Sequence, residues 1–151
     1  AVSISPLFRK DFSDAFLDNL KLSKIFWSYT FGLTIISTLI YLTVMLFGET
    51  LYFYFLGSSW LESASFASAV IMLYCLKFIV SPTSFLIFII GKYKFNALIH
   101  IFLLVAMVFV FWYFEFNNPF IAVSMFSYIY SLFYVIFFTF LVIFVRKAEF
   151  K

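Results

Sequence analysis

The sequence has very little charge. Only 11% of its 151 residues are Asp, Glu, Lys or Arg, against about 25% in an ordinary soluble domain. Apolar residues make up 66% of the chain, and the mean hydropathy is +1.11. So few polar side chains cannot cover the surface of a water-soluble globule. The composition, with its long apolar runs, excludes a soluble domain and predicts an all-α integral membrane protein.

Residue types that carry chemistry are also scarce. The chain has one cysteine, Cys75, which excludes an intrachain disulfide framework, and one histidine, His100. It has no carboxylate in the middle of an apolar run, no metal-ligand spacing, no Ser/His/Asp or Cys/His arrangement and no glycine-rich phosphate loop. We therefore expect no catalytic residues, no metal and no cofactor, and a protein that is not an enzyme. The net charge of +3 gives no reason to expect nucleic acid as a partner.

Residues 1–24 precede the first long apolar run. The first residue is Ala1, and no signal-peptide pattern opens the chain, so we expect a processed start or a piece of a longer protein. Residues 1–8 read as the tail of a preceding helix. Phe12, Phe16 and Leu20 recur at helical spacing within a segment of mixed charge, which favours an amphipathic helix on the cytoplasmic membrane surface. A polar loop is the alternative.

Residues 25–151 are expected to form a four-span membrane bundle. The apolar runs predict spans at about 25–47, 64–90, 97–114 and 120–145, each long enough for a hydrocarbon core of about 30 Å. Residues 48–63 are expected to form a tight hairpin, because Gly48 and Glu49 interrupt the first run. Ser124, Ser127 and Ser131 give the last span a small-residue face for close packing.

The basic residues predict the orientation. Every Lys and Arg except Lys77 lies before the first span, in the 91–96 turn or after the last span. The two opposite connections carry only Glu49, Glu62 and Glu115. By the positive-inside rule, both termini and the 91–96 turn are expected on the cytoplasmic side.

Lys77 is the unusual residue, because it lies in the middle of the 64–90 run. A charge at that depth costs about 3 kcal/mol on insertion scales, so it rarely faces lipid. Tyr74, Ser81 and Ser84 share its helical face. Pro82 cannot donate a backbone hydrogen bond, which predicts a kink and a possible hinge close to the charge. This pattern predicts a wall that faces water, substrate or another helix.

Several segments resemble the C-terminal part of bacterial polysaccharide flippases of the multidrug/oligosaccharidyl-lipid/polysaccharide (MOP) exporter superfamily. The resemblance covers most of residues 1–95 and is only hydropathic beyond them; Ile4-Ser5-Pro6-Leu7-Phe8-Arg9 resembles the end of the preceding family helix. The motifs, in order, are Phe47-Gly48-Glu49, Phe55-Leu56-Gly57-Ser58-Ser59-Trp60, Ser81-Pro82 and Gly91-Lys92-Tyr93-Lys94. Family members have about twelve spans in two lobes, so the resemblance implies the last four spans, a fragment lacking the N-terminal lobe.

The resemblance implies a function in the bacterial cytoplasmic (inner) membrane. Such proteins flip undecaprenyl-pyrophosphate-linked oligosaccharides, such as O-antigen units for lipopolysaccharide, by alternating access between two lobes. The implied partners are the lipid-linked oligosaccharide, membrane lipid, the N-terminal lobe and a polysaccharide polymerase. Lys77, Tyr74, Ser81 and Ser84 would then be substrate-binding residues.

The sequence leaves alternatives open for the roles of Lys77 and His100 and for the function of the whole chain. Lys77 either attracts the pyrophosphate or pairs with a carboxylate or carbonyls of the other lobe. His100 is either a proton relay, since histidine titrates near neutral pH, or an interfacial residue. The whole chain is alternatively a self-standing four-span protein that handles undecaprenyl-phosphate-linked sugars, or a subunit of a polysaccharide-assembly complex.

The predicted orientation is testable by cysteine accessibility. Single cysteines introduced at Lys92 and Lys147 should be protected from an impermeant maleimide in intact cells and react after the cells are opened, because both positions are expected in the cytoplasm. Labelling of either position in intact cells would contradict the orientation.

Overall fold

The structure is a computed structural model, and it describes residues 4–18, 21–113 and 118–149. Every regular element in these ranges is helical, which confirms an all-α protein. Four of its helical segments are long and apolar enough to cross a membrane. The elements are α1 (Ile4–Leu17), α2 (Leu22–Leu56), the 3-10 turn η1 (Ser58–Trp60), α3 (Leu61–Thr83), α4 (Leu86–Ile89), α5 (Tyr93–Tyr113) and α6 (Pro119–Glu149).

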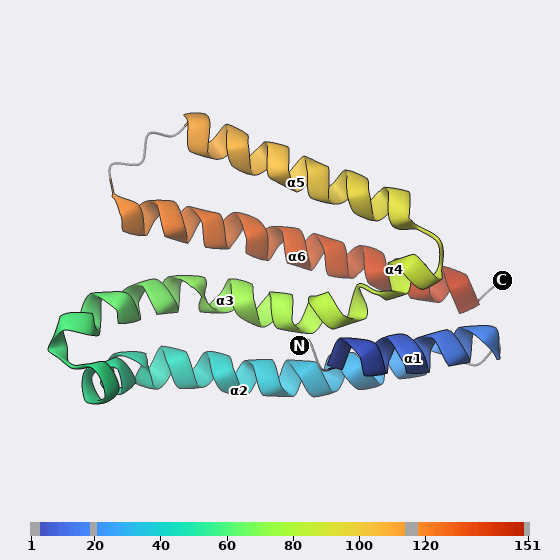
Figure 1. Ribbon diagram of the computed structural model, residues 1–151, viewed down its shortest axis with the longest axis horizontal. Helices are drawn as coiled ribbons and strands as arrows, with labels where there is room; N and C mark the ends of the chain where they lie inside the picture. The colour runs from blue at the N-terminus through green and yellow to red at the C-terminus, as the bar shows by residue number, and fades with distance from the viewer. Residues whose placement is uncertain (1–3, 19–20, 114–117, 150–151) are drawn as a thin grey trace.

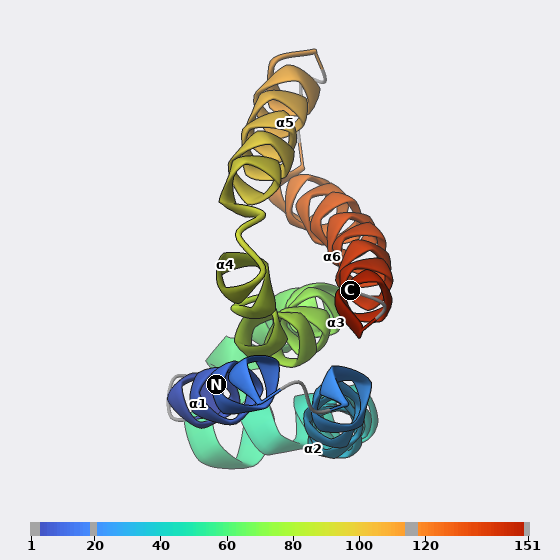
Figure 2. The same cartoon turned by 90° about the vertical axis from the view of Figure 1, so that its right-hand side faces the viewer.

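The four long helices form a row in the order α5, α6, α3, α2 (Figure 1). α3 packs most extensively of all, against α2 on one side and α6 on the other. α5 is at the edge of the row and contacts α6 and α4. α1 and α4 lie on one side of the row, near the end where α2 begins and α6 ends (Figure 2).

α2 and α3 are joined at mid-length by a reciprocal pair of side-chain hydrogen bonds. The Ser37 hydroxyl donates to the Cys75 carbonyl oxygen over 3.0 Å, and the Cys75 thiol donates to the Ser37 carbonyl oxygen over 3.4 Å. Ser37 is buried, so the bonds form inside the α2–α3 contact. Small polar side chains of this kind allow close approach of membrane helices.

α2 runs past Gly48 and Glu49, where the sequence predicted its end, so that boundary is wrong, whereas the chain does turn within the expected 48–63 hairpin, at Gly57–Trp60. The helix continues through Gly48 and Glu49 to Leu56. One glycine costs only about 1 kcal/mol in a helix, which is too little to end α2 at this position. The turn comes at Gly57, whose φ of +88° suits glycine.

The predicted single helix over residues 64–90 is divided in two. α3 begins earlier, at Leu61, and ends at Thr83, one residue after Pro82. The Ser84 hydroxyl donates to the Ser81 carbonyl oxygen over 2.7 Å, a local bond of the kind that compensates for backbone bonds lost near a proline. The short α4 follows, and Gly91, with φ of +75°, then turns the chain toward α5.

The sequence predicted a helix tail at 1–8 followed by a separate surface helix, and the structure shows that this division is wrong. One helix covers Ile4–Leu17, and the side chains that it buries are Phe8, Phe12 and Ala15. Phe16 is 38% exposed, and Leu20 lies outside the described residues. The sequence therefore predicted the wrong apolar face for this helix, because the predicted set of residues did not include Phe8, which belongs to the same helix.

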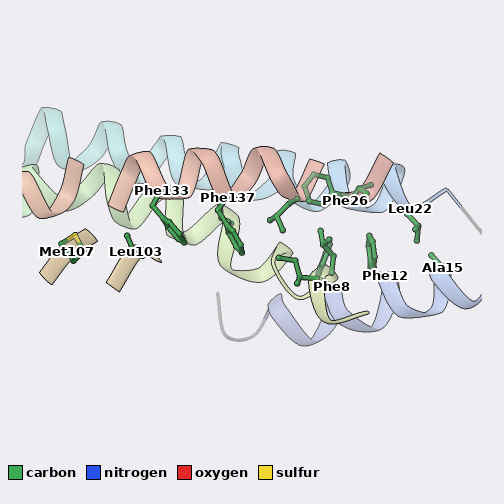
Figure 3. Close-up of a cluster of buried hydrophobic side chains, with 14 residues drawn as sticks. Phe8, Phe12, Ala15, Leu22, Phe26, Leu103, Met107, Phe133 and Phe137 are labelled. Carbon is green, nitrogen blue, oxygen red and sulfur yellow. The ribbon is translucent and has the colours of Figure 1, made fainter. Parts of the chain in front are cut away.

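The buried face of α1 packs into the membrane bundle. Phe8 and Phe12 project toward Phe26 of α2 (Figure 3), and the Phe8 ring meets the Tyr29 ring edge-to-face with centroids 5.3 Å apart. The Tyr29 hydroxyl also donates a hydrogen bond to the Asp11 carboxylate. These contacts make α1 part of the bundle and not a separate surface helix.

Hydrogen bonds also fix the ends of α6. The Asn118 side-chain oxygen accepts from the Phe120 N–H over 2.8 Å, next to Pro119 in the first turn, which is a favourable start for a helix. At the other end, the Glu149 carboxylate accepts from the Ser23 N–H over 2.6 Å. The carboxylate thus occupies the first turn of α2, where the helix dipole favours negative charge.

The α2–α3 contact predicts a specific cross-link. Ser37→Cys should form a disulfide with Cys75 under copper–phenanthroline, because the reciprocal bonds hold the two backbones close together. With a protease site in the Gly57–Trp60 turn, the two halves of the cleaved protein should stay joined on a non-reducing gel. Thr34→Cys, one turn away and exposed, is the control and should not join them. Equal cross-linking of both variants would contradict this packing.

Candidate functional site

Lys77 lies on a side of α3 that the described helices leave partly uncovered. Its side chain is exposed, and so is that of Tyr74, which is 56% exposed. Leu73 and Val80, four residues before and three after Lys77 on the neighbouring strip of α3, are buried, so Lys77 lies at the edge of the packed side of the helix. In the part of the chain that the structure describes, no residue forms an ion pair or hydrogen bond with the Lys77 ammonium. We call this side of α3, with Tyr74, Lys77, Ser81 and Ser84, the lysine face.

The contact between Ser37 and Cys75 gives the depth of Lys77. At about 1.5 Å per residue, Ser37 lies about 20 Å along α2 from Lys24 and about 18 Å from Glu49. Lys77 follows Cys75 by two residues on the antiparallel helix, so it is about 17 Å from the level of Lys24 and about 21 Å from that of Glu49. In a hydrocarbon core of about 30 Å bounded near these two levels, the backbone of Lys77 would lie close to the midplane.

The other residues of the lysine face differ in burial and in how many of their polar groups are available to a ligand. Ser81 and Ser84 are half-buried. The Ser84 hydroxyl proton is already donated to the Ser81 carbonyl oxygen, so this hydroxyl keeps only its acceptor lone pairs. Pro82 is fully buried, on a different side of α3 from Lys77. Lys77 and Tyr74 are the accessible pair, while the hinge role of Pro82 stays a prediction.

His100 belongs to a separate aromatic cluster. Its Nδ1 lies 2.8 Å from the Asn96 carbonyl oxygen, so Nδ1 carries a proton, because a carbonyl only accepts. The imidazole ring meets Phe133 and Phe137 of α6 edge-to-face, with centroids 5.4 and 5.5 Å apart. Within the described ranges, no contact joins His100 to the lysine face, and its role as a proton relay stays a prediction.

A groove between α1 and the α3–α4 joint was not expected from the sequence. Its volume is about 680 Å³, and it is lined by Ser5, Pro6, Arg9, Lys10, Ser13, Asp14 and Phe85. The Arg9 guanidinium carbon lies 5.9 Å from the centre of the Phe85 ring, within the range of a cation–π contact. The residues come from segments about seventy positions apart, so no local pattern reveals the groove.

Within the described ranges, no three His, Cys, Asp or Glu side chains come together as metal ligands. Basic side chains are presented by the lysine face and by the groove at the α1–α4 joint; Lys21 and Lys24 line another pocket, and Arg146 a further one. The lysine face and the groove both suit the binding of an anion and supply no nucleophile–base pair among the described residues.

Comparison of the chain with family models, with curated proteins and with solved structures gives no match. The fold and composition define the class: a multi-pass, all-α membrane protein with four membrane-spanning helices.

The exposure of Lys77 predicts water access at mid-depth. In a Cys75→Ala background, Lys77→Cys should react with an impermeant methanethiosulfonate, because a thiol ionises and reacts where water reaches it. Ile35→Cys is the matched control, since Ile35 lies at a similar depth on α2 and is 47% exposed, on a surface expected to face lipid. Equal reactivity of the two cysteines, or none at Lys77→Cys, would contradict a water-facing site.

Proposed function

We propose that this chain takes part in the export of undecaprenyl-pyrophosphate-linked oligosaccharides, such as O-antigen or other surface polysaccharide units, by alternating access. The site would be the bacterial cytoplasmic membrane. The four helices would form part of one lobe of a MOP-type transporter, facing a second lobe across the substrate cavity. This proposal joins the sequence resemblance to the placement of Lys77.

The observation that carries the proposal is an accessible ammonium near the midplane with no partner among the described residues. A lysine there is too costly to leave in contact with lipid, so a partner or water must reach it in the working protein. A pyrophosphate supplies such a partner as it crosses. Tyr74, on the same face, adds a ring and a hydroxyl of the kind that contacts sugars.

The mechanism needs no covalent chemistry. The lysine face forms a wall of the cavity, and Lys77 compensates the charge of the pyrophosphate where water is scarcest. Rocking of one lobe against the other then opens the cavity to alternate sides of the membrane, while the lipid tail remains in the bilayer. Lys77 would hold the anion as a point charge without strict geometry, which suits a ligand that must also leave.

The distribution of basic residues supports the proposed orientation. The start of α2, the α4–α5 turn and the end of α6 lie at one end of the molecule (Figure 1). Lys21 and Lys24, Lys92 and Lys94, and Arg146 and Lys147 belong to these three segments. By the positive-inside rule, this end would face the cytoplasm together with the end of α6. α1 begins nearer the middle of the molecule's length and ends at this end (Figure 1), so its position does not add support for a cytoplasmic N-terminus.

The proposal predicts that Lys77 acts through its charge. In the complete transporter, Lys77→Arg should retain much of the export, while Lys77→Met should reduce it at least about tenfold, equivalent to about 1.4 kcal/mol. Lys77→Met should keep or increase the amount of protein in the membrane, because it removes the cost of burying a charge. The measurements are polymer display on cells and the level of each variant.

Protein abundance separates binding of substrate from a structural ion pair. If Lys77 instead pairs with a carboxylate elsewhere in the protein, its loss strands that carboxylate, and abundance falls together with export. Normal export by Lys77→Met at normal abundance would refute the proposed role of Lys77.

A further inference from the structure

The groove between α1 and the α3–α4 joint has the chemistry of a phosphate site. Arg9 and Lys10 supply two positive charges, and the Ser13 hydroxyl is a further lining group. Arg9 and Lys10 are exposed, and Phe85 is half-buried. Arginine binds phosphate with two parallel hydrogen bonds, and lysine adds a point charge.

The Phe85 ring positions the arginine. The guanidinium carbon lies 5.9 Å from the ring centre, and this contact uses none of the hydrogen-bond donors of the arginine, which can still bind an anion. α1 is held in place independently by its buried phenylalanines, Phe8 and Phe12. The backbone of α1, which supplies six of the seven lining residues, is therefore held against the α3–α4 joint, and the exposed charged side chains extend from it.

The groove lies at the end of the lysine face. Phe85 directly follows Ser84, and Lys77 is eight residues earlier, about 12 Å along the helix axis. The face leads from Phe85 past Ser84 and Ser81 to Lys77. α1 and α4, whose surroundings include the groove, lie toward the end of the molecule where α2 begins and α6 ends (Figure 1), so a lipid phosphate arriving from that side would meet Arg9 before Lys77.

We propose that this groove is a loading site on the cytoplasmic side, which binds the pyrophosphate of the polyprenyl-linked substrate before it moves along the lysine face to Lys77. The inference rests on the proposed export function and adds a second site and an order of binding. Asp14 also lines the groove, and its negative charge weakens anion binding there, which suits a site that must release its ligand.

The test is direct binding of undecaprenyl pyrophosphate to the full-length protein in phosphatidylcholine nanodiscs, measured by native mass spectrometry. Arg9→Gln combined with Lys10→Gln should weaken binding about tenfold or more, because charge-assisted phosphate contacts are lost. Asp14→Asn should strengthen binding, a gain that misfolding cannot produce. The matched controls are Lys94→Gln, a basic residue at the same end, and Asp18→Asn, an acidic residue next to α1; neither should change binding.

Each outcome bears on the inference. Unchanged binding in the Arg9/Lys10 variant, or an equal effect of Lys94→Gln, would overturn the groove as the site. Equal retention of phosphatidylglycerol and undecaprenyl pyrophosphate would also overturn it, because the groove would then hold any anionic lipid. If the charge changes alter binding as expected but the complete protein does not flip the lipid, the result contradicts the proposed export function and supports the groove as a binding site. If export depends on Lys77 but not on Arg9 and Lys10, the result contradicts the loading site but not the export function.

Discussion

A lysine ammonium near the middle of the membrane is the constraint around which this fold is arranged. Transfer of such a charge into hydrocarbon is unfavourable by several kcal/mol, so the folded protein must offer it water or an anion. α3, which carries the lysine, is the central helix of the row and packs against α2 and α6. That packing holds two sides of α3 and leaves the lysine face open, so an anion or water can approach from one direction.

Many of the other polar side chains of the long helices have partners within the protein, although the buried hydroxyls of Thr30 and Ser131 form no hydrogen bond among the described residues. The hydroxyls of Thr34, Thr43, Ser124 and Thr139 each donate to a carbonyl oxygen four residues earlier in their own helix. Ser37 and Cys75 satisfy each other across α2 and α3. Such bonds meet the requirement that polar groups in a bilayer find partners within the protein. The Lys77 ammonium has no such partner among the described residues, which is why we propose a functional role for it.

The sequence predicted the parts of the structure that depend on hydropathy and helical period. Long apolar runs predicted four membrane helices, and the period of 3.6 grouped Tyr74 with Lys77. The end of α2 was missed because a single glycine, Gly48, is a weak helix breaker. The order of the helices in the row could not be predicted, because their apolar surfaces offer little local information about which partner each will contact. The groove was missed for a related reason: Arg9 and Phe85 meet only through the docking of α1.

A structure of the complete transporter with undecaprenyl-pyrophosphate-linked oligosaccharide in a lipid nanodisc, determined by electron cryomicroscopy, would test the central claim most directly. The account predicts a state in which the Lys77 ammonium lies within about 4 Å of a pyrophosphate oxygen, near the midplane. A Lys77 that stays paired with a protein carboxylate in every state, with the pyrophosphate following a different path, would contradict it.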